Sequence, residues 1–217
     1  KISASFLVNL MMRKILQEAC GMPYYRNHQA VSGAVHNISS HEDAVKDVIL
    51  SHGLNEVDRK ISKKERDAWL ADPYSCDLAE GTFLFQPCGQ NDSPDFIVKV
   101  NGKAYFLECK SVKGLTKAPM YNSGVPKAGY IYIFTAERYN ETTIYFGQDV
   151  CPPEDYNNFQ ELIEEHRKLD ERYNKRFTNN FGIQHYTRPM VKHVGGTDYF
   201  VNEYREQIEQ GVLRAKV

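Results

Sequence analysis

The sequence predicts an α/β (α+β) domain in which a central mixed β-sheet is flanked by helices. Helix-forming patterns open the chain, strand patterns occupy its middle and further helix patterns close it, an order typical of one sheet covered by helices. An apolar hairpin over 96–112 and a buried-looking strand over 130–134 supply the expected sheet. The chain has 217 residues, 41% of them hydrophobic, which is enough for one sizeable core.

Several stretches outside the sheet are expected to be helical. Residues 4–20 form an amphipathic pattern that is too short to span a bilayer, so no membrane partner is expected. Ser39 and Glu42 match the capping-box pattern, which predicts the start of a helix over 41–53. Further helices are expected over 62–71, 158–176 and 198–210.

The hairpin is the most informative part of the sequence. Residues 101–102 are Asn-Gly, the pair that favours a type I′ turn because both central residues of this turn need a positive φ. A two-residue turn at this place makes Phe96 the partner of Leu107. A β-bulge would shift this register, so the pairing is a prediction to be tested by the structure.

Continued by one step, the same register places Asp95 opposite Glu108, with Lys110 on the same face of the strand. Two carboxylates directly across an antiparallel pair repel each other unless a cation lies between them. Mg²⁺ is the natural candidate, because it takes oxygen ligands and is typically held by one or two carboxylates plus a phosphate. The residues leave one alternative open, a surface ion network in which Lys110 and Lys99 neutralise the two acids.

Pro-Asp at 94–95, followed by a hairpin and by Glu-Cys-Lys at 108–110, resembles the PD-(D/E)XK signature of a nuclease superfamily. The resemblance spans residues 94–110 directly and residues 40–150 by the order of the elements. It implies a restriction-endonuclease-like core and a lysine that activates or positions the attacking water. By resemblance the catalytic residues are Asp95, Glu108 and Lys110, and the metal ligands are Asp95, Glu108 and the backbone carbonyl of Cys109.

Glu42 is a further candidate for the same site. Families with this core often carry an additional acid on the helix that precedes the hairpin. On the helix over 41–53, Glu42 lies at the edge of the apolar stripe and can lean towards the hairpin end. The resemblance therefore adds Glu42 as a catalytic residue and metal ligand. The alternative is that Glu42 serves only the capping box, since acids favour helix N-termini.

Stand-alone size, near-zero net charge and long insertions on both sides of the core resemble a type II restriction endonuclease. The resemblance implies a Mg²⁺-dependent, sequence-specific endonuclease that hydrolyses phosphodiester bonds in double-stranded DNA. Cutting both strands of a palindromic site requires two active sites, so a homodimer is expected. Two alternatives stay open: a structure-selective DNA repair or junction-resolving nuclease, and a non-catalytic DNA-binding module that retains the nuclease fold. We expect a single nuclease domain over 1–217, with a core over 40–150 and helical additions at 1–39 and 151–217.

Local basic clusters are needed for any contact with DNA, because 27 basic and 28 acidic residues leave a net charge of −1. Two segments that carry lysine or arginine among hydrogen-bonding side chains are candidates, the loop over 113–127 and the stretch over 182–193. Both are equally compatible with ordinary surface loops. The candidate DNA-contacting residues are Lys113, Lys117, Tyr121, Asn122, Lys127, Gln184, His185, Arg188 and Lys192.

Other classes of site lack their usual signatures. Five scattered cysteines without a CxxC pair favour a reducing, cytoplasmic environment over a disulfide framework or a zinc knuckle. The sequence contains no glycine-rich phosphate loop before a helix and no GxSxG nucleophile motif. Cys109 falls on the strand face opposite Glu108, which indicates a core cysteine and not a nucleophile.

Overall fold

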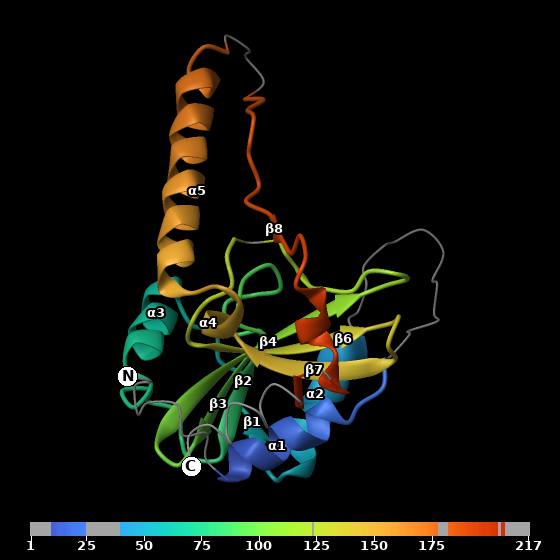
Figure 1. Ribbon diagram of the computed structural model, residues 1–217. Helices are drawn as coiled ribbons and strands as arrows, with labels where there is room; N and C mark the ends of the chain where they lie inside the picture. The colour runs from blue at the N-terminus through green and yellow to red at the C-terminus, as the bar shows by residue number, and fades with distance from the viewer. Residues whose placement is uncertain (1–9, 25–39, 123, 178–181, 204, 207–217) are drawn as a thin grey trace, which may run out of the picture.

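The computed structural model describes residues 10–24, 40–122, 124–177, 182–203 and 205–206 of the chain. A six-stranded mixed sheet with the order β1-β2-β3-β4-β6-β7 occupies the centre, and helices lie on both of its faces (Figure 1). The expected class, a mixed α/β fold with a central sheet flanked by helices, is confirmed.

The strands of the main sheet are β1 (Asn55–Glu56), β2 (Thr82–Phe85), β3 (Phe96–Val100), β4 (Lys103–Val112), β6 (Tyr130–Ala136) and β7 (Glu141–Phe146). A second sheet holds β5 (Met120–Tyr121) and β8 (Val191–Lys192). The helices are α1 (Leu10–Cys20), α2 (Ser40–Ser51), α3 (Lys63–Ala71), α4 (Gly147–Val150) and α5 (Pro153–Asn174), and the 3₁₀ turn η2 covers Thr197–Phe200. No helix within the described ranges is long and apolar enough to cross a bilayer.

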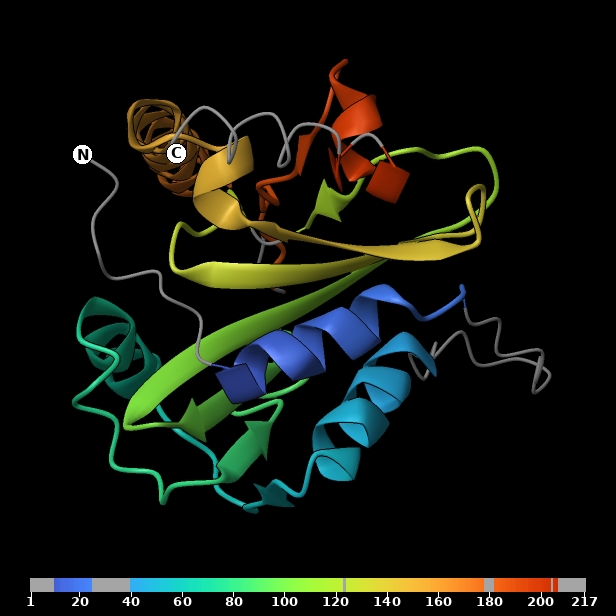
Figure 2. The same cartoon turned by 60° about the horizontal axis from the view of Figure 1, so that its bottom comes forward.

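Helices α1 and α2 lie side by side and cover one face of the sheet (Figure 2). Their apolar stripes, which include Ile15 and Ile49, pack against the inward side chains of the strands. On the opposite face, Trp69 of α3 and Phe200 of η2 belong to a second apolar cluster. The central strands are therefore buried on both faces, which explains the continuous apolar run over 130–134.

The hairpin of β3 and β4 has the register that the sequence predicts. Residues 101–102 take φ values of 50° and 72°, as a type I′ turn requires, and Phe96 pairs with Leu107. Lys99 does not neutralise the acids: it is buried, and its Nζ donates hydrogen bonds to carbonyl oxygens of Cys76 and of the turn. The alternative of a surface ion network is therefore wrong for Lys99.

Several other elements differ from the expectation. Helix α5 begins at Pro153 and not at residue 158, because proline fits the first helical position, where its fixed φ suits the helix and no N–H is needed. Where a helix is expected over 198–210, the 3₁₀ turn η2 ends at Phe200, Val201 is extended, and helical backbone follows at residues 202–203. Residues 4–9 and 207–210, which complete two expected helices, lie outside the described residues. Strands β1, β5 and β8 are not among the expected elements, because each holds only two residues and is too short to show a periodicity in the sequence.

Gly147, the first residue of α4, packs directly against the backbone of the loop that precedes β6. A Cβ atom at this position would lie 1.9 Å from the carbonyl oxygen of Lys127. Because backbone atoms cannot move aside as a side chain can, we expect Gly147→Ala to lower the free energy of unfolding by about 1–3 kcal/mol. Urea unfolding measures this loss. Gly129→Ala is the matched control, since its Cβ would meet only the flexible end of Leu70 and should cost clearly less.

Candidate active site

Asp95 lies directly before β3 and is held by backbone groups on two sides. Its backbone carbonyl accepts a hydrogen bond from the Gln86 N–H at 2.6 Å. Its side-chain Oδ2 accepts a second hydrogen bond from the Cys109 N–H on β4, also at 2.6 Å. The carboxylate is therefore tied to the strand that carries Glu108 and Lys110, one step beyond the last residue pair of the β3–β4 ladder.

Glu108 and Lys110 lie on one face of β4 and form an ion pair. The Lys110 Nζ lies 2.5 Å from the Glu108 Oε1, with 24% and 11% of the two side chains exposed. The second carboxylate oxygen of Glu108, Oε2, is buried and has no hydrogen-bond partner within the described part of the chain. A buried carboxylate oxygen without a partner is costly, so this atom marks a place where a cation or a donor would be stabilising.

Glu42 reaches the same region from the first turn of α2. Its Oε2 accepts a hydrogen bond from the Gln86 Nε2 at 2.9 Å. Burial raises the pKa of Glu42, and the negative charge of Glu108 raises it further. The structure thus brings Glu42 within electrostatic range of the hairpin acids. The capping box remains a prediction, since Ser39 lies outside the described residues.

The cluster holds three carboxyl groups, those of Asp95, Glu108 and Glu42, and one ammonium group, that of Lys110. Burial holds the pKa of Asp95 well above its usual range, and the charges of Glu108 and Glu42 add to this effect. Burial lowers the pKa of Lys110, but the Glu108 charge and hydrogen bond, together with the Asp95 charge, outweigh burial and raise this pKa. Three carboxyl groups therefore share one ammonium group in a poorly solvated place, an arrangement that favours an additional cation.

The donor atoms of this cluster suit a magnesium ion. Among the described residues, no three His, Cys, Asp or Glu side chains are gathered closely enough to hold a metal ion as they stand. Mg²⁺ does not need such a cage, because it is typically bound by one or two carboxylates and keeps several waters. The unpartnered oxygen of Glu108 and the neighbouring carboxylate of Asp95 fit this open mode of binding.

Cys109 is a core cysteine, as its strand face predicts. Its side chain is 7% exposed and belongs to the cluster under α1 and α2. Burial holds the pKa of its thiol well above the usual range, so the thiolate needed for nucleophilic attack is disfavoured. None of the five cysteines, all of which lie within the described residues, forms a disulfide bond.

A buried clamp beside Asp95 was not predicted. Arg66 of α3 is only 6% exposed, and its Nη1 donates hydrogen bonds to the Asp92 Oδ1 at 3.0 Å and to the Ser93 carbonyl oxygen at 2.9 Å. The Lys127 Nζ donates to the Ser93 Oγ at 3.0 Å. These bonds fix the short segment that leads into Asp95. Arg66 belongs to a basic cluster in the sequence, and only the three-dimensional contacts separate it from exposed lysines.

His41, next to Glu42, is a buried pH-sensitive group. Its Nε2 lies 2.9 Å from the carbonyl oxygen of Ile133 and must donate, so the neutral ring carries no proton on Nδ1, which is buried without a partner among the described residues. Burial lowers the pKa of His41, although the bond to Ile133 opposes this.

A lowered folded-state pKa means that the unfolded chain takes up the proton first. We expect stability to be fully present above about pH 6.5 and to be lost as the pH falls below it. In His41→Gln this loss should be smaller. Urea unfolding of both proteins between pH 7.5 and 5.5 measures the slope, and equal slopes would contradict the assignment to His41.

The structure contradicts the DNA contact expected of Tyr121. Tyr121 is 4% exposed, because its ring packs in the core and its hydroxyl lies 2.8 Å from that of Tyr145. Lys127 is half-buried, with its Nζ bonded to Ser93 and to the Tyr130 hydroxyl. The other candidates are exposed and stay predictions: Lys113, Lys117, Asn122, Gln184, His185, Arg188 and Lys192.

The two segments expected to contact DNA lie next to each other. Strands β5 and β8 pair antiparallel, with Met120 opposite Lys192. The Arg188 Nε donates a hydrogen bond to the carbonyl oxygen of Asn122 at 2.8 Å. Residues about 70 positions apart in the sequence thus form one continuous surface.

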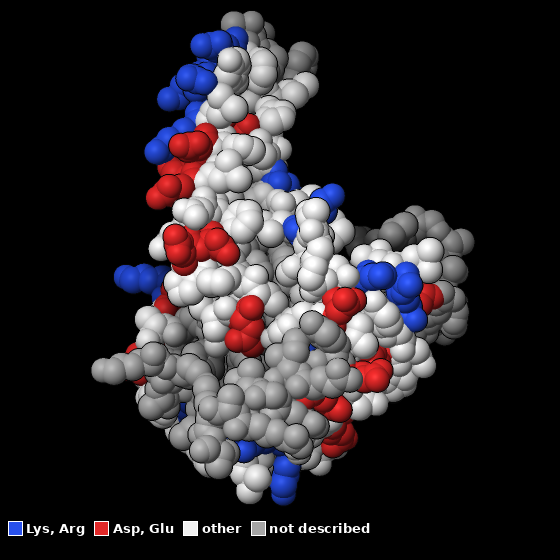
Figure 3. All heavy atoms as spheres, viewed as in Figure 1, with Lys and Arg blue, Asp and Glu red and all other residues white. Residues whose placement is uncertain are grey.

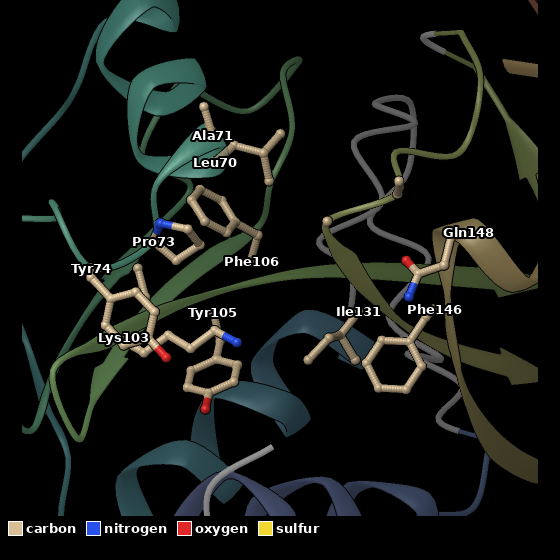
Figure 4. A pocket seen from close by; sticks show the side chains of 13 residues that line it. Leu70, Ala71, Pro73, Tyr74, Lys103, Tyr105, Phe106, Ile131, Phe146 and Gln148 are labelled. Atoms are coloured by element: carbon tan, nitrogen blue, oxygen red, sulfur yellow. The ribbon is translucent and has the colours of Figure 1, made fainter. Parts of the chain in front are cut away.

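A cavity of about 320 Å³ lies between the end of α3, the first residues of β4 and the start of α4 (Figure 4). Its walls are mainly apolar and include Leu70, Phe106 and Phe146. The Oε1 of Gln148, at the edge of this cavity, is buried without a partner among the described residues. None of the four candidate catalytic residues lines it, so this cavity and the acidic cluster are separate features of the molecule.

No family model matches the chain, and neither a curated protein nor a solved structure matches it. A functional conclusion must therefore rest on the geometry of the acidic cluster and on the resemblance of the motif over 94–110.

Proposed function

We propose that this protein is a Mg²⁺-dependent, sequence-specific endonuclease that hydrolyses phosphodiester bonds in double-stranded DNA, of the type II restriction class. The proposal includes a restriction-endonuclease-like core within the mixed sheet. One observation carries it: Asp95, Glu108 and Lys110 gather at the open end of one hairpin, with a Glu108 oxygen buried and unsatisfied. Buried side-chain oxygens in folded proteins usually have a hydrogen-bond partner, so this oxygen supports a cation site over a purely structural ion pair.

The proposed roles follow from where the side chains lie. Asp95 and Glu108 would hold the metal ion together with the Cys109 carbonyl, and Glu42 would extend this set from α2. A bound Mg²⁺ would neutralise charge that builds on the phosphate in the transition state. Lys110, held as an ammonium group by Glu108, would orient the water that attacks phosphorus in line and stabilise the hydroxide that forms as this water loses its proton to solvent. The bond from phosphorus to the 3′ oxygen breaks, which leaves 5′-phosphate and 3′-hydroxyl ends.

The surface formed by the two paired segments would hold the DNA. Lys113, Lys117 and Lys192 are exposed and can contact phosphates, which set the position of the protein on the duplex. The exposed Gln184 and Arg188 offer hydrogen bonds of the kind that distinguish bases in the major groove. A homodimer would supply the two active sites that cleavage of both strands needs.

The test is cleavage of unmethylated phage DNA by the purified protein, in Mg²⁺ and in EDTA. Discrete bands that depend on Mg²⁺ are expected. A smear, or cleavage confined to branched DNA, would favour a repair or junction-resolving nuclease instead. Binding in a gel-shift assay without any cleavage would overturn the enzymatic proposal and favour a DNA-binding module.

A further inference from the structure

Helix α5 (Pro153–Asn174) and the segment over 182–192 form an arm that projects from the body of the molecule (Figure 1). The segment is attached to one side of α5: Asp170 accepts hydrogen bonds from Thr187, and the His185 Nδ1 lies 2.8 Å from the same carboxylate. No residue of α5 is buried. Because helix stability in proteins comes mainly from packing of an amphipathic face, a helix of this kind calls for a partner.

Apolar side chains form a stripe on α5 beside the attached segment. Leu162, Leu169 and Tyr173 are 48%, 44% and 45% exposed. At about 100° per residue they fall within an arc of about 40°, so they share one face. Asp170, which binds the segment, points about 80° away from Leu162 by the same count. Leu162 also lines the edge of a groove of about 580 Å³ that separates α5 from the segment, so the stripe borders this groove. Asp155 continues the stripe at the N-terminal end of α5. Arg176 lies in the turn just after the last helical residue, with its guanidinium over the ring of Tyr173.

The charges on α5 are divided between its halves. Residues 153–165 contain five acidic side chains and no lysine or arginine, whereas residues 166–177 contain five basic and two acidic side chains. In Figure 3 the basic side chains gather towards the tip of the arm and acidic ones towards its base. Within the described residues, Arg167 and Lys168 use Glu164 and Glu171 as ion-pair partners, and Asp155 and Arg176 have none.

We propose that this face of α5 binds the same face of a second copy of the chain, with the two helices antiparallel. We place the two-fold axis of the antiparallel pair between residues 165 and 166 of each helix. In this register Leu162 lies opposite Leu169 of the partner subunit. The same register places Asp155 opposite Arg176 of the partner subunit, and each contact occurs twice because the interface is isologous. The acidic half of one helix thus faces the basic half of the other.

A nucleic acid fits this face less well than a second copy does. The five acids of the first half of α5 would repel phosphates along half the length of the stripe. The pattern of leucines and tyrosine is apolar and has the spacing of residues that pack between helices. The dimer inference does not depend on the proposed DNA cleavage and holds or fails without it.

The first experiment is sedimentation velocity on the full chain at concentrations from about 0.1 to 100 μM, the range in which interfaces of micromolar affinity dissociate. A concentration-dependent dimer is expected. Joint replacement L162E and L169E should raise the dimer dissociation constant by about a hundredfold or more, because four buried charges would face each other. L50E, at an exposed leucine of α2, is the matched control and should leave the dimer intact.

A charge exchange tests the antiparallel register and guards against a variant that simply unfolds the arm. D155R and R176D should each weaken the dimer about tenfold, since each creates two like-charge contacts. The double variant D155R and R176D should restore the dimer, because each arginine again faces an aspartate of the partner subunit. A contact within one subunit cannot explain such a restoration, since residues 155 and 176 lie at opposite ends of α5. A monomer at every concentration, or a dimer indifferent to these changes, would overturn the proposal.

Discussion

Replacement of Lys110 by methionine is expected to lower the rate of DNA cleavage by about 10²–10⁴-fold, the range usual for loss of a group that acts on the transition state. Methionine keeps most of the unbranched stem but removes the ammonium group, which lies 2.5 Å from the Glu108 carboxylate. Without it, nothing at this place would orient the attacking water. Single-turnover cleavage in excess enzyme separates this effect from weaker DNA binding.

Lys113→Met is the matched control for Lys110. Lys113 is exposed and lies three residues further along, beyond the end of β4. Its removal should weaken binding and lessen the salt dependence while leaving the single-turnover rate close to that of the wild type. A rate for Lys110→Met within a few-fold of wild type would contradict the role given to Lys110.

Asp95→Asn is expected to change stability and activity in opposite directions. Burial, with Glu108 and Glu42 close by, raises the pKa of Asp95, so the folded protein favours the neutral acid. Stability of the wild type therefore falls as the pH rises from the usual aspartate value through the raised folded value. Asparagine is neutral at every pH and can still accept the Cys109 N–H bond. At pH 8 in EDTA we expect the variant to gain about 0.5–2 kcal/mol.

The same variant should lose the response to magnesium. Mg²⁺ is expected to raise the melting temperature of the wild type, because a ligand that binds only the folded state stabilises it. In Asp95→Asn this increase should disappear together with cleavage. If Mg²⁺ raised the melting temperature of the variant as much as that of the wild type, Asp95 would not be a ligand of the metal ion.

Asp92→Asn is the control for Asp95→Asn, and we expect it to change the free energy of unfolding in the opposite direction. Asp92 lies three residues before Asp95, but its carboxylate is 3.0 Å from Arg66 and 2.7 Å from Lys63. Burial acts to raise the pKa of Asp92, yet these partners hold it below its usual value. Asparagine can still accept a hydrogen bond but would leave the buried Arg66 guanidinium without the negative charge that faces it, so a loss of stability of about 1–3 kcal/mol is expected. Urea unfolding in EDTA compares both variants.

The hairpin illustrates what a single sequence can predict about a site. The Asn-Gly turn at 101–102 sets the register of Phe96 against Leu107, and both are as expected. Register depends on residues a few positions apart, whose allowed dihedral angles and alternating faces are local properties. The closeness of Asp95 to β4 followed from this reasoning alone.

Burial was the quantity that the sequence predicted least well. Tyr121 lies among lysines in the sequence and was expected at a DNA surface, yet it packs in the core against Tyr132. Lys99 and Arg66 belong to the charged types that are seldom fully buried, and both are buried and hydrogen-bonded. Whether a side chain is buried depends on which distant segment covers it, and this information is not local.

The sequence by itself determined the class of fold, the hairpin and the pairing that places Asp95 near Glu108, because dihedral preferences and strand periodicity act over a few residues. Only the tertiary structure decided that Glu42 comes within range of these acids, that Arg66 holds the segment before Asp95, and that β5 joins β8. Each of these contacts links parts of the chain that are 26 or more positions apart. They arise from the packing of whole helices and strands, which local preferences do not specify.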